Sequence, residues 1–218
     1  MVSYEGIRLK LLKLRRVSVA NVRKKRLNDT NFTIISNNCW GGMLYECYNL
    51  PKQSPTVGLF IMASDYIKFL SDLRNYINTP LEFIDPEKSK WKNKLAKDEQ
   101  FGSYPIGRLK DVEIFFLHYA SQEEAREKWN RRVKRINWDR ILVKFNDQNG
   151  CTEKDVEDFL RLPFEHKIFF TCKDWNVEDD NNVIIKIRQY IKPDFVRASY
   201  EPFGHNRYID LDKLVNSL

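Results

Sequence analysis

Short apolar runs alternate with segments of helical periodicity along most of the chain. Continuous apolar runs are typical of strands in sheets that are covered on both faces. The predicted strands are residues 32–36, 56–62, 81–84, 112–118, 141–145 and 167–172. Apolar positions with helical spacing predict helices at residues 64–78, 121–135, 152–160 and 182–190. This alternation indicates an α/β protein with Rossmann-like layers and a mostly parallel central sheet.

Hydroxyl side chains mark the starts of three predicted helices. Ser64 precedes one apolar helical stripe, and Ser121 precedes another. Thr152 is followed three residues later by Asp155, which fits a capping box, because each side chain can bond the other residue's backbone amide. We therefore expect these helices to begin close to the three hydroxyl residues.

The composition indicates an ordered protein with one main domain. The chain has 218 residues, of which 42% are hydrophobic, and no stretch rich in Pro, Gly and Ser divides it. We expect residues 1–27 to form a basic amphipathic arm and residues 28–218 to form a single α/β domain. The four cysteines are far apart, which disfavours a disulfide framework or a zinc site. Because no signal peptide or membrane span is visible, a cytoplasmic location is expected.

The net charge of +7 is concentrated in the arm. Residues 1–27 carry nine Lys and Arg residues against one acid, so the rest of the chain, with 28 bases and 29 acids, is nearly neutral. Leucines and valines interleave with these bases, as in helices that lie on anionic membranes. We expect either peripheral contact with the inner face of the membrane or a solvated leader packed on the domain. Nucleic acid is not favoured as a partner, because no DNA- or RNA-binding motif accompanies the charge.

The segment TIISNNCWGG predicts a site at the end of the first strand. Ligands of parallel sheets bind at the carboxyl ends of the strands, so Asn37, Asn38 and Trp40 are expected at that edge as ligand-binding residues. Gly41 and Gly42 are predicted to lie in a loop there, where backbone amides could approach a ligand closely. A plain turn is the alternative. Neither GxGxxG nor the GxxxxGK[ST] phosphate loop is present, and the sequence identifies no cofactor.

Several segments resemble one bacterial family. They are FTIISNNCWGG, the SPT that begins at Ser54, SDYIKFLSDLRNYI, YPIGRLKDVEIFFLHY and EAREKWNRRVKRIN, in order over about residues 30–215. Members of this family are often labelled exopolysaccharide biosynthesis proteins and have no established biochemistry. The resemblance implies a cytoplasmic protein connected with the assembly of surface polysaccharides, but it identifies no catalytic residues. It leaves the basic arm outside.

Two titratable residues at the ends of predicted strands are candidates for catalysis. His118 ends one strand, where an imidazole could act as a general base near neutral pH, with Tyr119 beside it as a ligand-binding residue. Asp147 follows another strand and could bind a sugar hydroxyl or act as a base. A nucleophilic Cys39 paired with His118 is an alternative, although the sequence does not show that the two residues meet. Each of these residues could instead be structural.

Further candidate ligand-binding residues lie on the predicted helix 121–135 and near the C-terminus. Arg131 and Arg132 could hold the phosphates of a nucleotide sugar or a lipid diphosphate, because a guanidinium fork binds two phosphate oxygens. The alternative is a solvated basic face balanced by neighbouring glutamates. The loop YEPFGHNRY contains Glu201 and His205 among aromatic residues, a composition found where sugars stack and form hydrogen bonds. No metal site is expected there, because these two residues lack a third nearby ligand.

The candidate residues and the resemblance together favour a group transferase that acts on a nucleotide- or lipid-linked sugar. The alternative is a non-catalytic accessory protein that binds a sugar or a nucleotide. In either case the expected ligand is a sugar-containing small molecule or a lipid-linked glycan. Measured turnover would distinguish the two hypotheses.

Overall fold

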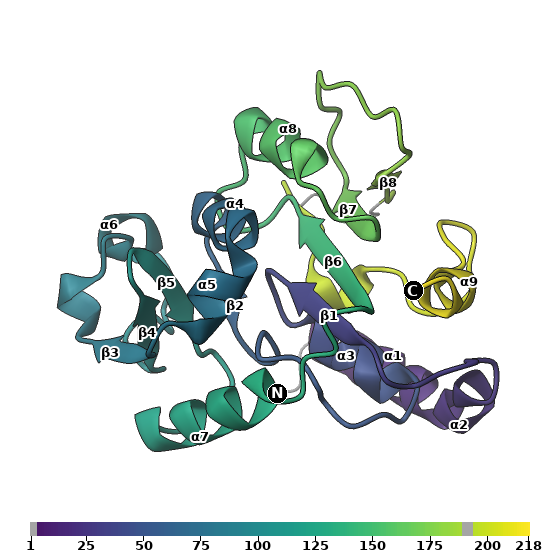
Figure 1. Ribbon diagram of the computed structural model, residues 1–218, viewed down its shortest axis with the longest axis horizontal. Coiled ribbons are helices and arrows are strands. Elements are labelled where there is room, and N and C mark those ends of the chain that lie inside the picture. The colour runs from purple at the N-terminus through teal and green to yellow at the C-terminus, as the bar shows by residue number, and fades with distance from the viewer. Residues whose placement is uncertain (1–3, 189–193) are drawn as a thin grey trace.

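Two four-stranded sheets organise the chain, of which the computed structural model describes residues 4–188 and 194–218 (Figure 1). The first sheet is parallel, in the order β1 (Thr33–Ser36), β6 (Ile141–Asn146), β7 (Lys167–Thr171) and β8 (Ile184–Lys186). The second is antiparallel, in the order β2 (Phe60–Ile61), β5 (Val112–Phe115), β4 (Ile106–Leu109) and β3 (Glu82–Ile84). The predicted α/β class with a parallel sheet is confirmed, but three of the predicted strands belong to the antiparallel sheet.

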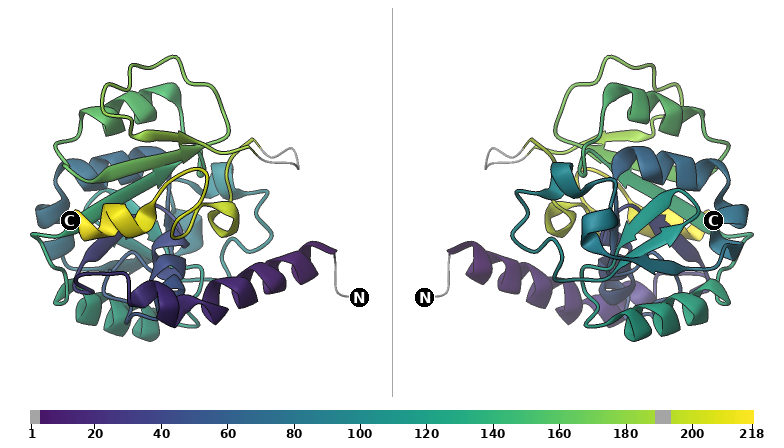
Figure 2. Two further views of the ribbon diagram at one scale, coloured as in Figure 1. Left: turned by 90° about the vertical axis from the view of Figure 1, so that its right-hand side faces the viewer. Right: turned by 90° about the vertical axis from the view of Figure 1, so that its left-hand side faces the viewer.

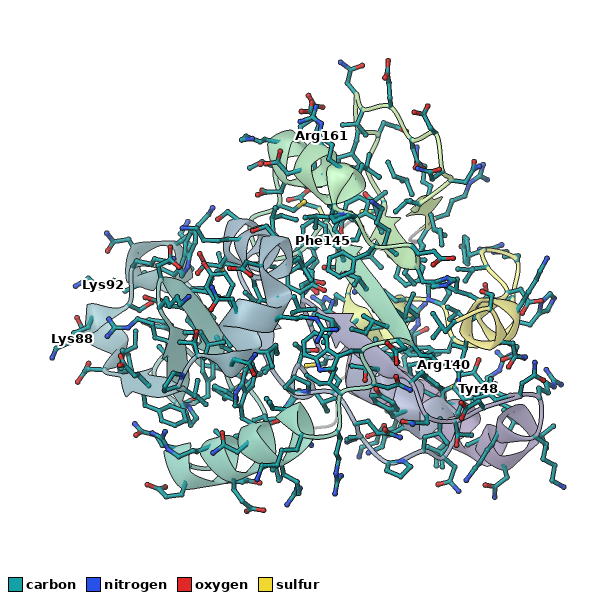
Figure 3. All side chains as sticks on the ribbon, in the orientation of Figure 1. Tyr48, Lys88, Lys92, Arg140, Phe145 and Arg161 are labelled. Atoms are coloured by element: carbon teal, nitrogen blue, oxygen red, sulfur yellow. The ribbon has the colours of Figure 1, made fainter. Side chains whose placement is uncertain are left out.

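Both faces of the parallel sheet are covered, which explains its continuous apolar runs. Ile34 of β1 belongs to the core that contains residues of α3 (Trp40–Cys47) and α9 (Leu211–Asn216). Phe145 of β6 lies on the other face, between the sheet and the helices α4 (Ala63–Ser71) and α8 (Glu153–Arg161) (Figure 3). Its ring centre is 5.6 Å from that of Tyr66 and 5.2 Å from that of Phe159. A strand that is buried on both faces has no solvent-facing positions to fill with polar residues.

The predicted capping residues begin two of the three helices. The side chain of Ser121 accepts a hydrogen bond at the start of α7 (Gln122–Val133), and Thr152 and Asp155 form the predicted capping box of α8. Ser64, in contrast, lies inside α4, which begins after Met62. The predicted helix at residues 64–78 is divided at Asp72 into α4 and α5 (Leu73–Asn78).

The predicted helix at residues 182–190 is wrong as far as the structure describes this segment. Residues 189 and 190 lie outside the described residues, and residues 184–186 form β8. Ile184 is opposite Phe169 of β7, and Ile185 is opposite Phe170. Pairing with a neighbouring strand overrides local helical spacing in so short a segment.

A short helical excursion follows β3. It contains η1 (Pro86–Lys88) and α6 (Lys92–Leu95). Between them, the indole Nε1 of Trp91 donates to Asp65 of α4 at 2.8 Å, and Lys90 pairs with the same carboxylate at 2.6 Å. These two contacts with Asp65 attach the excursion to α4.

The basic arm forms α1 (Tyr4–Ser18) and α2 (Ala20–Lys24) along one edge of the molecule (Figure 2). Its inner side packs on the domain, because Ala20 is buried and Arg16 pairs with Glu46 of α3 at 3.3 Å. Its outer side is apolar and exposed. Within residues 4–188 and 194–218, the exposed large hydrophobic side chains all belong to the arm: Tyr4, Ile7, Leu11, Leu14, Val17, Val19 and Val22. No helix in this part of the chain is long and apolar enough to cross a membrane.

Candidate functional site

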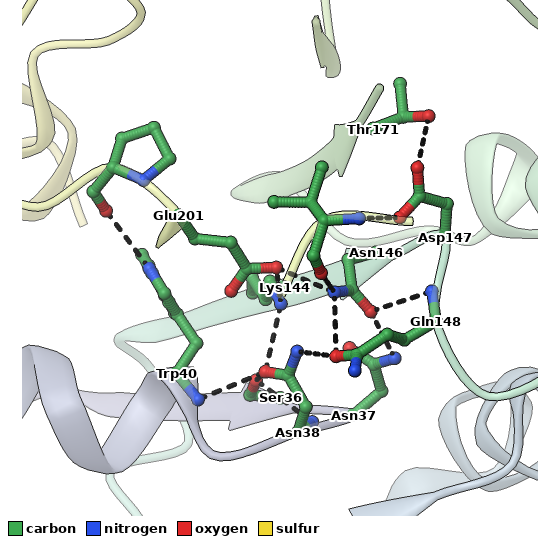
Figure 4. A network of polar contacts seen from close by, with 12 residues as sticks. Ser36, Asn37, Asn38, Trp40, Lys144, Asn146, Asp147, Gln148, Thr171 and Glu201 are labelled. Atoms are coloured by element: carbon green, nitrogen blue, oxygen red, sulfur yellow. Dashed lines mark hydrogen bonds and ion pairs between the residues drawn. The ribbon is translucent and has the colours of Figure 1, made fainter. Parts of the chain in front are cut away.

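A wholly buried lysine lies at the carboxyl ends of β1 and β6. The side chain of Lys144 on β6 has no exposed area, and its ammonium nitrogen is 2.6 Å from Oε1 of Glu201 and 3.0 Å from Oδ1 of Asn38 (Figure 4). Its position on the strand faces the side of the sheet that α3 covers, where Leu142 two residues earlier is part of the apolar core. Burying an ammonium group is costly unless it is paired, so this contact defines the centre of the candidate site.

Glu201 is the partner that brings the C-terminal segment to this edge. It follows η2 (Ala198–Tyr200), and its Oε1 also accepts a hydrogen bond from Nδ2 of Asn146 at 2.8 Å. Burial raises the pKa of Glu201 to about 7, although the ion pair with Lys144 acts in the opposite direction. Burial also lowers the pKa of Lys144, again opposed by Glu201. A carboxyl group with a pKa near neutrality can both accept and donate a proton at physiological pH.

Two amide side chains contact this pair directly, Asn38 through Lys144 and Asn146 through Glu201. Asn38 accepts hydrogen bonds from Lys144 and from the backbone amide of Trp40 at 3.0 Å, and it donates to Gln148 at 3.1 Å. Asn37 donates to Asn146 at 2.9 Å. The prediction that Asn37 and Asn38 lie at the carboxyl edge of the parallel sheet is confirmed, because β1 ends at the residue before them.

Asp147 lies at the same edge, as predicted, but its carboxylate binds protein groups. One oxygen accepts hydrogen bonds from Thr171 Oγ1 at 2.8 Å and the amide of Cys172 at 2.9 Å, and the other accepts from the amide of Val196 at 2.6 Å. These bonds join β6, β7 and the C-terminal segment (Figure 4). The geometry therefore gives Asp147 a scaffolding role.

The two glycines lie in α3, so the prediction of a loop at Gly41 and Gly42 is wrong. A Cβ atom on Gly41 would lie 3.3 Å from Cγ2 of Ile34, and one on Gly42 would lie 2.8 Å from Cγ1 of Val57. The glycines allow the helix to approach β1 and the segment after α3 more closely than larger residues would. Trp40, at the start of the helix, is buried beneath the site, and its Nε1 donates to the carbonyl of Pro202 at 3.0 Å.

The residues predicted around His118 form a separate group. Tyr119 and Arg132 are buried and both donate to the carbonyl of Val57, so they hold that segment in place. His118 is only partly exposed, and its partial burial, together with the positive charge of Lys52, lowers its pKa. Among the described residues, no hydrogen bond or ion pair joins His118 to Lys144 or Glu201. The roles predicted for these residues are therefore not supported by proximity to the buried pair.

Two further candidates have surroundings that argue against the proposed chemistry. Burial raises the pKa of the Cys39 thiol to about 11, which leaves it protonated and a weak nucleophile at neutral pH. Arg131 lies on the exposed face of α7 and forms an ion pair with Glu127 one turn away. It is thus part of the solvated basic face that was the alternative interpretation.

A cavity of about 630 Å³ lies beside the buried pair. One wall consists of Tyr200, Glu201, Phe203, His205 and neighbouring residues from the C-terminal loop, and the other consists of Leu12, Arg15, Arg16 and Arg23 from the arm. His205 pairs with Asp210 at 3.1 Å. A larger cavity of about 980 Å³ lies near α9, but neither Lys144 nor Glu201 is among its described lining residues. Glu201 and His205, which were predicted to lie in one loop, are thus both among the residues that line this cavity. Of the two, only Glu201 belongs to the buried ion pair.

Lys144 and the arginines of the arm were not among the site residues predicted from the sequence. Lys144 is the one charged residue in the run ILVKFN, which is otherwise typical of a strand buried on both faces. A basic side chain at such a buried position needs a buried counter-ion. The sequence therefore indicated that Lys144 has an acidic partner. Its partner, Glu201, is 57 residues away and could not be assigned without the fold.

Comparisons with known proteins identify relatives without a described activity. The family described as "Domain of unknown function (DUF1919)" matches residues 11–213. An "Uncharacterized protein" of Haemophilus influenzae is 34% identical over 173 residues, which cover 79% of this chain and 77% of that protein. The family match begins inside the arm, so the expectation that the arm lies outside the resemblance is wrong for residues 11–27.

Proposed function

The chain belongs to the DUF1919 family, and from its candidate site we propose that it is a group transferase of surface-polysaccharide biosynthesis that acts on a nucleotide- or lipid-linked sugar. One observation carries this proposal. Glu201 is one of the residues that line a cavity, and its wholly buried carboxylate forms an ion pair with the wholly buried Lys144 at the carboxyl ends of parallel strands. The connection with exopolysaccharides rests only on the resemblance of segments such as FTIISNNCWGG described above, because the relatives found carry no such description.

The layer arrangement supports a ligand at this edge. We interpret the parallel sheet with helices on both faces as Rossmann-like layering, in which ligands bind outside the carboxyl ends of the strands. Asn37, Asn38 and Asn146 lie there, and their amide groups donate to Asn146, Gln148 and Glu201 and so fix the edge at which a ligand would bind. The cavity is in the size range of small-molecule sites.

In the proposed reaction Glu201 acts as the general base, for which its side chain, wholly buried in this structure, has to turn toward the cavity. Its carboxylate accepts the proton of an acceptor hydroxyl while the hydroxyl oxygen forms a bond to the anomeric carbon of the donor sugar. The bond from that carbon to the phosphate oxygen breaks, and the phosphate group leaves with the electron pair. Lys144 positions the carboxylate and keeps part of its population ionised near pH 7.

The test is transfer from a panel of nucleotide sugars and polyprenyl-diphosphate-linked sugars, followed by mass spectrometry of the released nucleotide or lipid diphosphate. Glu201→Gln should abolish release. Glu165→Gln is the matched control, because that carboxylate is 89% exposed and outside the site. Ligand binding without turnover in the unmodified protein would support the non-catalytic accessory protein instead.

We also propose that the outer side of α1 attaches the protein to anionic membranes. Ile7, Leu11 and Leu14 lie on one face of the helix, with Leu11 60% and Leu14 66% exposed. Lys10 and Lys13 are exposed beside them, so a lipid surface would meet apolar and basic groups together. A membrane location at the inner face would suit a lipid-linked substrate.

Replacing Ile7, Leu11 and Leu14 together by Gln is expected to weaken binding to vesicles containing anionic lipid by at least about tenfold, because apolar burial is lost. The melting temperature should change little, since these side chains are exposed. Vesicle sedimentation at low salt measures the effect, with neutral vesicles as the control. Equal sedimentation of the triple variant and the unmodified protein would disprove the attachment. Deleting residues 1–27 is a poorer test, because Ala20 is buried against the domain.

A further inference from the structure

The cavity between the arm and the C-terminal loop has a strongly basic lining. Arg15, Arg16 and Arg23 line it from the arm, and Arg207 lines it from the loop. Glu201 is the one acidic residue in the described lining, and its carboxylate is wholly buried and paired with Lys144. A cavity with this excess of guanidinium groups is suited to an anion rather than to a neutral sugar.

Unpartnered polar atoms are concentrated on the same cavity. Among the residues that the structure describes, four buried side-chain nitrogen or oxygen atoms have no hydrogen-bond partner. Three of them belong to residues of the cavity lining: Nε of Arg16, the hydroxyl of Tyr200 and Oε2 of Glu201. Native proteins rarely leave buried donors unpaired, so this concentration points to a ligand that supplies the missing acceptors and a donor.

Two of the arginines in the cavity lining, Arg16 and Arg23, are held in place by contacts with the protein. Arg16 donates from Nη2 to Glu46 at 3.3 Å, and its guanidinium carbon lies 5.3 Å from the ring centre of Phe203. Arg23 donates to the carbonyl of Arg16 at 3.1 Å and contacts the thiol of Cys47 at 2.8 Å. Binding an anion here would therefore require little ordering of the arginines.

We propose that this cavity is the diphosphate subsite of the transferase. Arg15, Arg16 and Arg23 neutralise the diphosphate, and the Tyr200 hydroxyl donates to one of its oxygens. This inference rests on the proposed function and extends it, because it makes the arm part of the substrate site.

Nucleotide and lipid donors share the diphosphate, so the test uses probes from both sources. Pyrophosphate, UDP and farnesyl diphosphate are titrated by calorimetry into the full-length protein. The variants are Tyr200→Phe and Arg15→Gln. Lys13→Gln is the matched control, because it removes one exposed charge from α1 and Lys13 does not line the cavity.

We expect pyrophosphate to bind the unmodified protein and the Lys13→Gln variant alike. Tyr200→Phe should bind it about tenfold more weakly, the effect of losing one hydrogen bond to a charged group. The same variant should melt at or above the temperature of the unmodified protein, because the hydroxyl that it removes has no partner in the folded protein. Arg15→Gln should also weaken binding and make it less dependent on salt.

Three outcomes separate this inference from the proposed function. The diphosphate subsite would be overturned if none of the three probes bound the unmodified protein. It would also be overturned if Tyr200→Phe and Arg15→Gln both bound pyrophosphate as tightly as the unmodified protein does. Either result would hold whether or not sugar transfer depends on Glu201. Weakened binding by both variants supports the subsite even if no transfer is found, in which case the transferase proposal alone fails. Tighter binding of farnesyl diphosphate than of UDP would identify the lipid-linked donor, and the reverse order would identify the nucleotide-linked donor.

Discussion

Replacing Lys144 by Met is expected to lower the free energy of unfolding by about 3–5 kcal/mol at pH 8. The substitution leaves the carboxylate of Glu201 buried without its counter-ion and removes the donor to Asn38. Methionine fills a similar volume, so the loss reflects charge rather than a cavity. Urea unfolding followed by tryptophan fluorescence measures the change, and a loss below about 1 kcal/mol would show that the pair is not energetically coupled.

The effect of Lys144→Met should depend on pH. The pKa of Glu201 in the folded protein is about 7, above its ordinary value of 4.5. The folded state therefore holds this proton more tightly than the unfolded state, and the resulting stability is complete below about pH 4.5 and is lost as the pH rises through 7. Without Lys144 the pKa of Glu201 rises further, so the variant should recover much of its stability at pH 5. Equal losses at pH 5 and pH 8 would contradict this.

The double variant Lys144→Met with Glu201→Gln is the internal control for that prediction. Removing both charges leaves no unpaired ion, and replacing a buried pair by neutral residues is often close to neutral for stability. We expect the double variant to be more stable than Lys144→Met at pH 8. A variant that folds without the pair separates its role in function from its role in stability.

Replacing Asp147 by Ala is expected to cost about 3–5 kcal/mol of unfolding free energy. It would leave the Thr171 hydroxyl and the amides of Cys172 and Val196 without their acceptor. Asp174→Ala is the matched control, because that carboxylate is 91% exposed. Thermal and urea unfolding measure both variants. Should Asp147→Ala unfold like the unmodified protein and lose turnover, its predicted catalytic role would be right and the scaffolding role wrong.

Local patterns predicted the parts of the fold that depend on neighbouring residues. The apolar run that contains Ile34 gave the first strand because both faces of that strand are buried, and Thr152 and Asp155 cap α8 through bonds within four residues. The segment at Ile184 was predicted as a helix because its pairing partner, Phe169, lies far away in the sequence. The antiparallel sheet was missed for the same reason.

The candidate site was predicted in part. Asn37 and Asn38 follow a parallel strand, so their place at the carboxyl edge could be inferred from topology. Gly42 was interpreted as a loop residue, whereas its missing Cβ makes room for Val57, a contact that no local pattern encodes. The ion pair of Lys144 and Glu201 joins distant segments, and only a charged residue within an apolar strand indicated that such a partner exists.

We infer that the buried pair of Lys144 and Glu201 is held in place for a ligand. This is tested most directly by comparing the binding of sugar diphosphates to two folded proteins. The unmodified protein and the double variant Lys144→Met with Glu201→Gln are titrated by calorimetry with nucleotide sugars and polyprenyl-diphosphate-linked sugars, after circular dichroism has shown that both are folded. We expect at least one of these compounds to bind the unmodified protein and the double variant to bind it at least about a hundredfold more weakly, since two charge-assisted contacts are lost. Equal binding by the two proteins, or no binding by the unmodified protein to any of the compounds, would contradict it.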